Sequence, residues 1–125
     1  MQMVFYDTHS HIYDEAFAGE EDLAIRRAAE AGVSKIIFPD IDSQTRAHMF
    51  SVAERHPGVV FPCLGLHPTS VDAGWKEEME RMEEYKSANI HAIGEIGIDC
   101  YWSKEFLKEQ EEVFRLQLEL AHRTG

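Results

Sequence analysis

The sequence predicts an α/β protein whose core is a parallel sheet built from four strand–helix units. Short runs rich in Val, Ile and Phe alternate along the 125 residues with longer, charge-laced segments of helical periodicity. Successive strand–helix–strand units require right-handed crossovers, which place the strands parallel to one another. No low-complexity linker interrupts the alternation, so we expect a single domain.

The expected strands are the apolar runs, and they cover about residues 3–8, 34–38, 59–64 and 90–95. The helices that follow them cover about residues 20–31, 43–55, 74–87 and the chain after Ser103. Gly32 suits a left-handed cap at the end of the first helix, Ser43 is the expected N-cap of the second, and Pro57 lies just beyond its end.

The third and fourth helices carry apolar side chains at helical spacing, which predict packing against the core rather than a cofactor site. These stripes are Trp75, Met79 and Met82 in the third helix, and Leu107, Phe114, Leu118 and Ala121 in the fourth. In parallel-sheet proteins the chemistry gathers at the carboxyl ends of the strands. The unusual polar residues of this chain all follow strands, so we expect one site at that end.

The strongest functional signal follows the first strand and reads Asp7-Thr8-His9-Ser10-His11. Alternate residues of an extended strand share a face, so the sequence predicts that Asp7, His9 and His11 point the same way. Two neutral imidazoles beside a carboxylate are suitable ligands for zinc or a transition metal. A short motif of this kind also arises by chance, and the alternative is a pair of surface histidines at a strand end.

Glu95 interrupts the fourth apolar run, where Gly94 and Gly97 lie close to it. A carboxylate in such a setting is costly unless it is paired or bound to a cation. The glycines would leave room for close approach by a ligand or another backbone. An ion pair with Lys or Arg of a neighbouring strand is the alternative, but the histidine pair favours a metal.

Other polar residues after the strands carry weaker signals. Pro68 favours an extended His67, whose imidazole would lie at the mouth of the site and contact a phosphate or a loop carbonyl. Asp99 would either orient a ligand or cap its turn, and the two interpretations are equally supported. Asp40 and Asp42 flank a turn, where a solvated loop is the simpler explanation.

The formal net charge of −11 argues against a protein that coats long duplex nucleic acid through a basic face. No apolar run is long enough for a membrane span, and the N-terminus carries no secretory signal, so we expect a cytoplasmic protein without a membrane partner. Cys63 and Cys100 are expected to be buried free thiols rather than a disulfide. The remaining histidines are expected to be structural or at the surface: His48, His56, His91 and His122.

The ordered motifs resemble the N-terminal half of TatD-family metal-dependent deoxyribonucleases, within the amidohydrolase-like superfamily. The resemblance covers essentially the whole chain and is carried by Asp7 to His11, Gly65-Leu66-His67-Pro68, Ala92 to Asp99 with Tyr101-Trp102, Gln110, and Phe114 to Ala121. It implies a (β/α)8 TIM barrel, of which residues 1–125 would form the N-terminal half of a single hydrolase domain.

The resemblance also implies a two-metal site holding Mg, Mn or Zn, in which His9 and His11 bind one ion and Glu95 bridges both. Glu95 and His67 would be catalytic, and His67 and Asp99 would contact the substrate. The implied activity is hydrolysis of DNA phosphodiester bonds from a strand end.

Family members are roughly twice as long, and their later strands supply two further histidines and an aspartate. We therefore expect this chain to be an incomplete enzyme that is inactive alone. Its open sheet edges would lead it to associate with a second copy, to remain as an open sheet, or to form part of a longer protein. Two alternatives remain open. One is a metal hydrolase of the same fold acting on an ester, lactone or amide, and the other is a non-catalytic half-barrel that self-associates.

Overall fold

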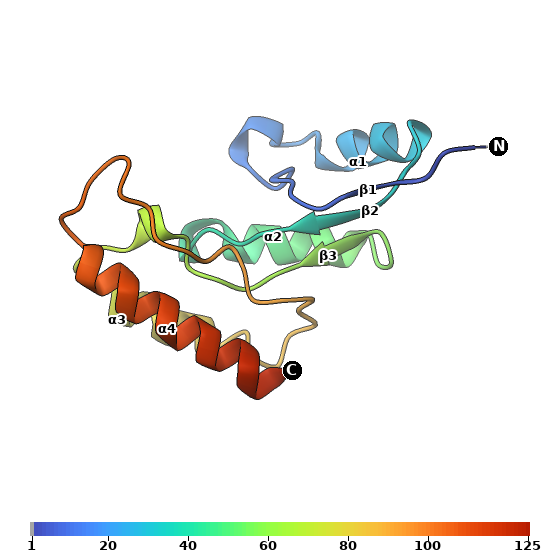
Figure 1. Ribbon diagram of the computed structural model, residues 1–125. Coiled ribbons are helices and arrows are strands. Elements are labelled where there is room, and N and C mark those ends of the chain that lie inside the picture. The colour runs from blue at the N-terminus through green and yellow to red at the C-terminus, as the bar shows by residue number, and fades with distance from the viewer. Residues whose placement is uncertain (1) are drawn as a thin grey trace.

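The computed structural model describes residues 2–125 and contains a three-stranded parallel sheet in the order β1-β2-β3 (Figure 1). The strands are β1 (Phe5–Asp7), β2 (Val33–Phe38) and β3 (Val60–Pro62). Asp7 pairs with Ile36, which in turn pairs with Val60 on its other side. Each strand leads through a helix to its neighbour, as the alternation of the sequence predicts.

Four α-helices follow these segments: α1 (Glu21–Glu30), α2 (Ser43–Arg55), α3 (Trp75–Glu83) and α4 (Leu107–Thr124). Two 3-10 turns, η1 (Glu15–Phe17) and η2 (Pro68–Ser70), lie in the loops after β1 and β3. Gly32 follows α1 with a φ of 99°, which confirms the predicted left-handed cap. The predicted N-cap Ser43 is wrong, because the Asp42 carboxylate accepts the Gln44 N–H and is itself the cap.

The expected fourth strand, residues 90–95, lies beside β3 but forms only an isolated parallel bridge between Leu64 and Ile93. The Gly94 N–H donates to the Leu64 carbonyl at 2.9 Å, as a strand in this position would. The Gly94 carbonyl then turns away and accepts the N–H of Asp40, also at 2.9 Å. The ladder along β3 therefore stops where this segment begins to bond to the end of β2.

The core lies between the sheet and the helices that cover it. Its buried members include Ile36, Phe38, Met49, Val52, Leu64, Leu66, Met82 and Val113. Met82 of α3 is buried and Trp75 and Met79 pack against the same cluster, so the predicted stripe of the third helix is confirmed.

The buried face of α4 differs from the predicted one. Gln110, Val113 and Gln117 are buried, whereas Leu118 of the predicted stripe is 48% exposed. The Gln117 side chain accepts the Leu66 N–H at 2.7 Å and donates to the Leu66 carbonyl at 3.3 Å. Glutamine therefore takes a core position because its amide satisfies a buried peptide group that an apolar side chain would leave unpaired.

Asp40 is fully buried, so the predicted solvated loop is wrong at this position. Its carboxylate accepts Arg46 Nε–H at 2.7 Å, the Gly65 N–H at 3.0 Å and the Ile41 N–H at 2.9 Å. Burial raises the pKa of Asp40 to about 6, against the opposing effect of Arg46. Asp42 is also structural, since it caps α2 and accepts Ser70 Oγ–H at 2.8 Å.

Among residues 2–125, no helix combines the length and the hydrophobicity needed to span a membrane. Cys63 and Cys100 are both free, but only Cys63 is buried, because Cys100 lies in the loop before α4. The side chains of Met3, Val4, Phe5 and Tyr6 are exposed along the sheet edge at β1.

Replacing Asp40 with alanine is expected to lower the free energy of unfolding by about 3–5 kcal/mol, because the buried Arg46 guanidinium would lose its counter-charge. Urea denaturation measures this loss. Lys86→Ala is the control, since it removes an exposed ion pair with Glu83 and should leave stability close to that of the wild type. Equal stability of the two variants would contradict a structural role for the Asp40–Arg46 pair.

Candidate metal centre

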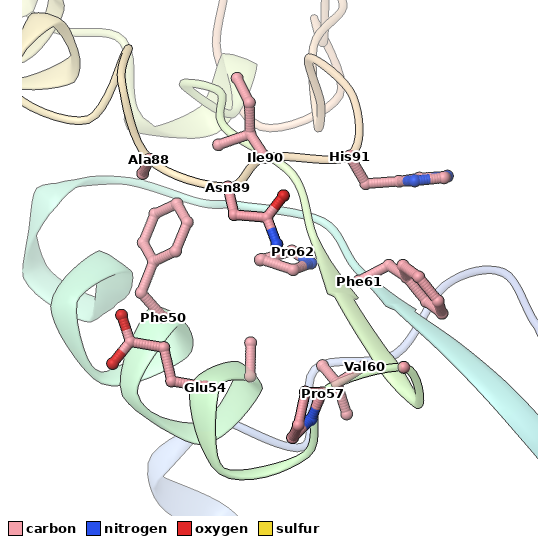
Figure 2. A pocket seen from close by; sticks show the side chains of 12 residues that line it. Phe50, Glu54, Pro57, Val60, Phe61, Pro62, Ala88, Asn89, Ile90 and His91 are labelled. Atoms are coloured by element: carbon pink, nitrogen blue, oxygen red, sulfur yellow. The ribbon is translucent and has the colours of Figure 1, made fainter.

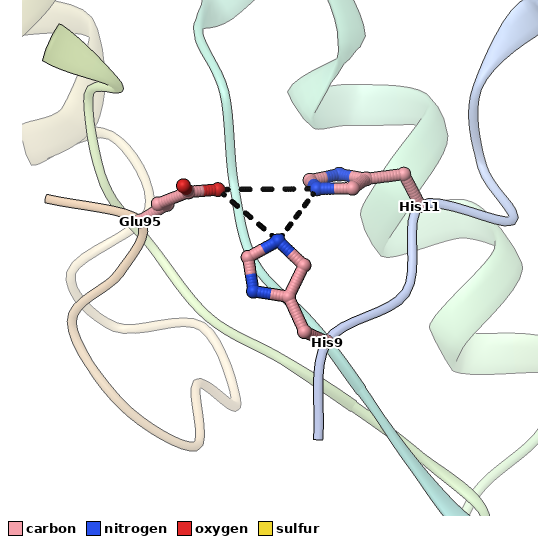
Figure 3. Close-up of side chains that lie close together, drawn as sticks. All are labelled: His9, His11 and Glu95. Atoms are coloured by element: carbon pink, nitrogen blue, oxygen red, sulfur yellow. Dashed lines mark hydrogen bonds and ion pairs between the residues drawn. The ribbon is translucent and has the colours of Figure 1, made fainter. Parts of the chain in front are cut away.

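His9, His11 and Glu95 converge at the carboxyl end of the sheet, with their side chains directed at one point (Figure 3). Nε2 of His9 lies 3.1 Å from Nε2 of His11 and 3.4 Å from Oε2 of Glu95. Nε2 of His11 lies 3.9 Å from the same carboxylate oxygen. The histidines come from the loop after β1, and Glu95 comes from the segment that runs beside β3.

These separations suit a metal ion. Two nitrogens bound tetrahedrally to zinc at about 2.05 Å lie about 3.3 Å apart, close to the two shorter separations observed here. Two imidazoles and a carboxylate are also a donor set that zinc and other transition metals accept. The side chains of His11 and Glu95 are about 30% exposed, which leaves the centre open on one side.

Tyr13 fixes the orientation and the tautomer of His11. The buried Tyr13 hydroxyl donates to the Pro39 carbonyl, so it must accept the proton of Nδ1–H of His11, 2.8 Å away. The lone pair of His11 then lies on Nε2, which faces His9 and Glu95. Burial, and secondarily the charge of His9, lowers the pKa of His11 and favours the neutral imidazole that a metal requires.

His67 contacts the centre in a different way. Its Nδ1 accepts the N–H of Thr69 at 3.1 Å, so the neutral ring carries its proton on Nε2. Nε2 lies 3.2 Å from Oε1 of Glu95 and donates to it. His67 is therefore placed as a hydrogen-bond donor beside the centre, and not as a further ligand of the same ion.

Gly65 determines how closely the Glu95 segment approaches β3. A Cβ atom at Gly65 would lie 2.7 Å from the carbonyl carbon of Gly94 and 2.8 Å from its oxygen. The sequence predicts close approach at the glycines flanking Glu95, but a Cβ at Gly94 or Gly97 would meet no atom of the described residues within 4 Å. The close approach depends instead on Gly65, in the segment that continues β3, because the two backbones touch there.

Asp7 and Asp99 stand apart from the three converging side chains. The Asp7 carboxylate accepts the N–H of His9 at 3.1 Å, because the chain leaves the extended conformation after Asp7 and strand alternation no longer applies. The Asp99 carboxylate accepts the N–H of Tyr101 at 2.9 Å and caps its turn, while Gln110 holds its backbone. A substrate contact of Asp99 stays a prediction.

Sequence reasoning missed Tyr13 and Thr69, the residues that orient the two site histidines. Each lies two residues after its histidine, so a hydroxyl-bearing residue at that spacing could have predicted the hydrogen bond to the imidazole. Two other histidines contact carboxylates of α1: Nε2 of His48 lies 3.1 Å from Oε1 of Glu21, and Nε2 of His56 lies 2.6 Å from Oδ1 of Asp22. They are structural, as predicted.

A separate hollow of about 500 Å³ lies at the opposite end of β3 (Figure 2). It is lined mainly by apolar side chains, among them Phe50, Val60, Phe61, Pro62 and Ile90, together with Glu54, Asn89 and His91. None of the three converging side chains contributes to it. It lies at the amino end of the strand, away from the edge where the candidate ligands meet.

Comparison with known proteins agrees with this geometry. The sequence model of the family described as TatD related DNase matches residues 6–125. This chain belongs to the TatD family. It is 34% identical over 122 residues to the uncharacterized metal-dependent hydrolase YjjV of Escherichia coli K12, covering 95% of this chain and 47% of that protein. It is 29% identical over 120 residues to the 3'-5' ssDNA/RNA exonuclease TatD of a Pantoea species, covering 93% and 45%.

Solved structures of TatD proteins match the fold. The crystal structure of E. coli YjjV superposes with a TM-score of 0.78, over 95% of this chain and 47% of that chain. A TatD-family hydrolase from Entamoeba histolytica, 22% identical, gives a TM-score of 0.71 over 98% and 47%. These neighbours are TIM-barrel hydrolases, so the predicted fold class is confirmed. The chain spans about half the length of the curated relatives it matches.

Gly65→Ala is expected to weaken metal binding at least about tenfold, because the new methyl group would push the Gly94–Glu95 backbone away from β3. Competition with a chromogenic chelator measures the affinity. Gly97→Ala adds the same methyl group in open space and should bind metal like the wild type. Unchanged affinity in both variants would show that the backbone contact does not position Glu95.

Tyr13→Phe is expected to weaken metal binding about 10–100-fold, since His11 would lose the hydrogen bond that fixes its tautomer. Tyr85→Phe is the control, because the Tyr85 ring stacks on Phe50 within the core and away from the centre. Calorimetric titration with Zn²⁺ and Mn²⁺ compares the two variants. An affinity equal to that of the control would rule out an orienting role for Tyr13.

Proposed function

We propose that this chain is the N-terminal half of a single TIM-barrel domain, residues 1–125, in a metal-dependent hydrolase that cleaves nucleic acid phosphodiester bonds at a strand end. The convergence of His9, His11 and Glu95 on one point is the observation that carries the proposal. Membership in the TatD family supports it, as does the name of the Pantoea relative, a 3'-5' ssDNA/RNA exonuclease. Because the chain spans half of such relatives, the activity is proposed for the protein that contains both halves.

Three residues of this chain would bind the metal, each through a defined atom. His9 and His11 would hold a divalent ion through Nε2, and Glu95 would supply a carboxylate oxygen to the same point. When bound, divalent ions supply Lewis acidity, lowering the pKa of a coordinated water and polarising a phosphoryl oxygen. We propose two such ions (Mg, Mn or Zn), with Glu95 bridging them.

His67 would bind the substrate phosphate as well as supporting Glu95. Its Nε2–H already donates toward Oε1 of Glu95, and Thr69 keeps the proton on that nitrogen. A donor fixed in this tautomer can move from a carboxylate oxygen to a phosphate oxygen without a proton transfer. The general base is expected from the other half of the barrel.

The charge of the protein favours a strand end over a long duplex. The net charge of −11 on this chain gives no general attraction for a polyanion, so within this half the affinity for phosphate would come from the centre itself. A single terminal phosphodiester needs only that local attraction. We therefore propose that the substrate, DNA, is attacked at a strand end.

The exposed edge of β1 supports the predicted self-association. Met3, Val4 and Tyr6 are 71%, 65% and 64% exposed, and β1 pairs with β2 alone among the described strands. An unpaired edge with apolar side chains is a template for another strand. We propose that isolated 125-residue chains associate there. The cytoplasmic location stays a prediction.

Glu95→Gln in the full-length protein is expected to lower nuclease activity at least about 100-fold, because one carboxylate ligand is lost. Release of nucleotides from end-labelled single-stranded DNA and RNA measures the activity, before and after chelation and metal return. Glu54→Gln, which changes an exposed carboxylate at the other end of β3, is the control. Full activity of Glu95→Gln, or of chelated protein, would refute the proposal. Hydrolysis of esters or lactones without cleavage of nucleic acid would show that the substrate is an ester or lactone and not nucleic acid.

A further inference from the structure

A second pocket, of about 400 Å³, lies between η2 and the loop that leads into α4. In Figure 1 this loop is the orange segment that rises beside the amino end of α4. The pocket has apolar and polar walls: Pro68, Thr69, Val71, Asp72, Asp99, Trp102, Ser103, Glu105, Phe106 and Gln110. Nothing in the proposed hydrolysis uses most of these side chains.

Thr69 joins this pocket to the candidate metal centre. It lines the pocket, and its N–H and Oγ1 lie 3.1 Å and 2.7 Å from Nδ1 of His67. His67 in turn contacts Glu95 through Nε2 at 3.2 Å. A molecule bound in the pocket would therefore contact Thr69, which itself contacts His67, the residue that would bind phosphate.

The aromatic wall of the pocket is largely exposed to solvent. Trp102 is 78% exposed, and Tyr101, which packs edge-to-face against it at a centroid distance of 4.7 Å, is 83% exposed. Two large aromatic side chains held together at the surface gain little from folding and offer flat faces to a ligand. Nucleobases stack on such faces whatever their sequence. Pro68 and Phe106 add apolar surface to the same pocket.

The negative charge of the pocket indicates that it binds the base of a nucleotide and not its phosphate. Three carboxylates line it, from Asp72, Asp99 and Glu105, and no Lys or Arg of residues 2–125 does. These groups repel a phosphate, but they accept hydrogen bonds from the exocyclic amino groups of cytosine, adenine and guanine. Thymine and uracil offer only a ring N3–H between two carbonyl oxygens, which the carboxylates repel, so the pocket suits an amino-bearing base better.

We infer that this pocket binds the terminal nucleobase of the strand whose phosphate lies at the metal centre. The base would stack on Trp102, and its amino group would donate a hydrogen bond to the acidic wall formed by Asp72, Asp99 and Glu105. The inference rests on the proposed function, since it supplies the substrate-recognition part of that site. The base would thus hold the strand end in register with His67, and cytosine-, adenine- or guanine-ended strands would bind more tightly than thymine-ended ones.

Oligonucleotide binding to the full-length protein tests this without requiring cleavage. In a Glu95→Gln background, fluorescence anisotropy gives the Kd for labelled deoxyhexamers ending in cytosine, thymine or an abasic site. Trp102→Ala is expected to raise the Kd for the cytosine-ended strand at least about fivefold, and Trp102→Phe should retain most of the affinity because it keeps a stacking face. Trp75→Phe, a tryptophan outside the pocket lining, is the matched control and should not change the Kd.

A second variant tests the acidic wall. Glu105→Gln is expected to reduce the preference for cytosine over thymine, since a carboxamide offers both a donor and an acceptor. Equal Kd values for wild type and Trp102→Ala, or for cytosine-ended and abasic strands, would overturn the subsite. If the subsite were overturned in this way while the wild type still cleaved these strands, the proposed hydrolysis would stand without the subsite. Trp102-dependent binding with no cleavage by the wild type would support the subsite and refute the hydrolysis.

Discussion

The candidate site depends on one contact, in which Asp40 joins the end of β2 to the Glu95 segment across the end of β3. The Asp40 N–H donates to the Gly94 carbonyl at 2.9 Å, and the Glu95 N–H donates to the Asp40 carbonyl at 3.2 Å. The Asp40 carboxylate meanwhile accepts the Gly65 N–H at 3.0 Å. These segments can meet only because Gly65 has no side chain, so two residues far apart in the sequence place Glu95.

Burial of this contact explains why an arginine is found in the core. An ionised Asp40 in an apolar interior would be strongly destabilising alone, and Arg46 compensates for it from the first turns of α2. The guanidinium also donates to the Gly65 carbonyl at 3.3 Å, so both peptide groups of Gly65 are held. Rigid backbone at this point matters for the site, because an error of about 1 Å at Glu95 would separate it from the histidines.

The residues that orient the site lie just outside it. Tyr13 ties His11 to the Pro39 carbonyl, and Thr69 ties His67 to the turn that follows β3. Both anchors are in loops that begin where a strand ends, so the same strand ends that bring the side chains together also fix their tautomers. This arrangement gives each imidazole a defined role, one as lone-pair donor and the other as proton donor.

The sequence predicted the parallel α/β class, four strands and four helices, and the structure forms three of those strands as regular elements together with all four helices. It also singled out His9, His11, His67 and Glu95, which the structure brings together. Local pattern was sufficient there because strand ends in a parallel sheet meet at one edge. Asp40 was misjudged because its burial results from long-range contacts with Arg46 and Gly65 that no local pattern reveals. The buried glutamines of α4 were missed for the same reason, since their partners are distant peptide groups.

Curvature of the sheet accounts for the meeting of the first and last strands. In a flat sheet, β1 and the fourth segment would be separated by three strand spacings, about 14 Å. The backbone of the fourth segment instead bonds to the end of β2, which in a flat sheet would be two strand spacings away, and the side chains of His9 and Glu95 then reach to within 3.4 Å of each other. A sheet that bends this strongly over so few strands is curling toward a barrel. The curvature that closes a TIM barrel therefore also brings the ends of the first strand and the fourth segment within reach of one another, and Gly65 permits the last backbone contact that places Glu95 there.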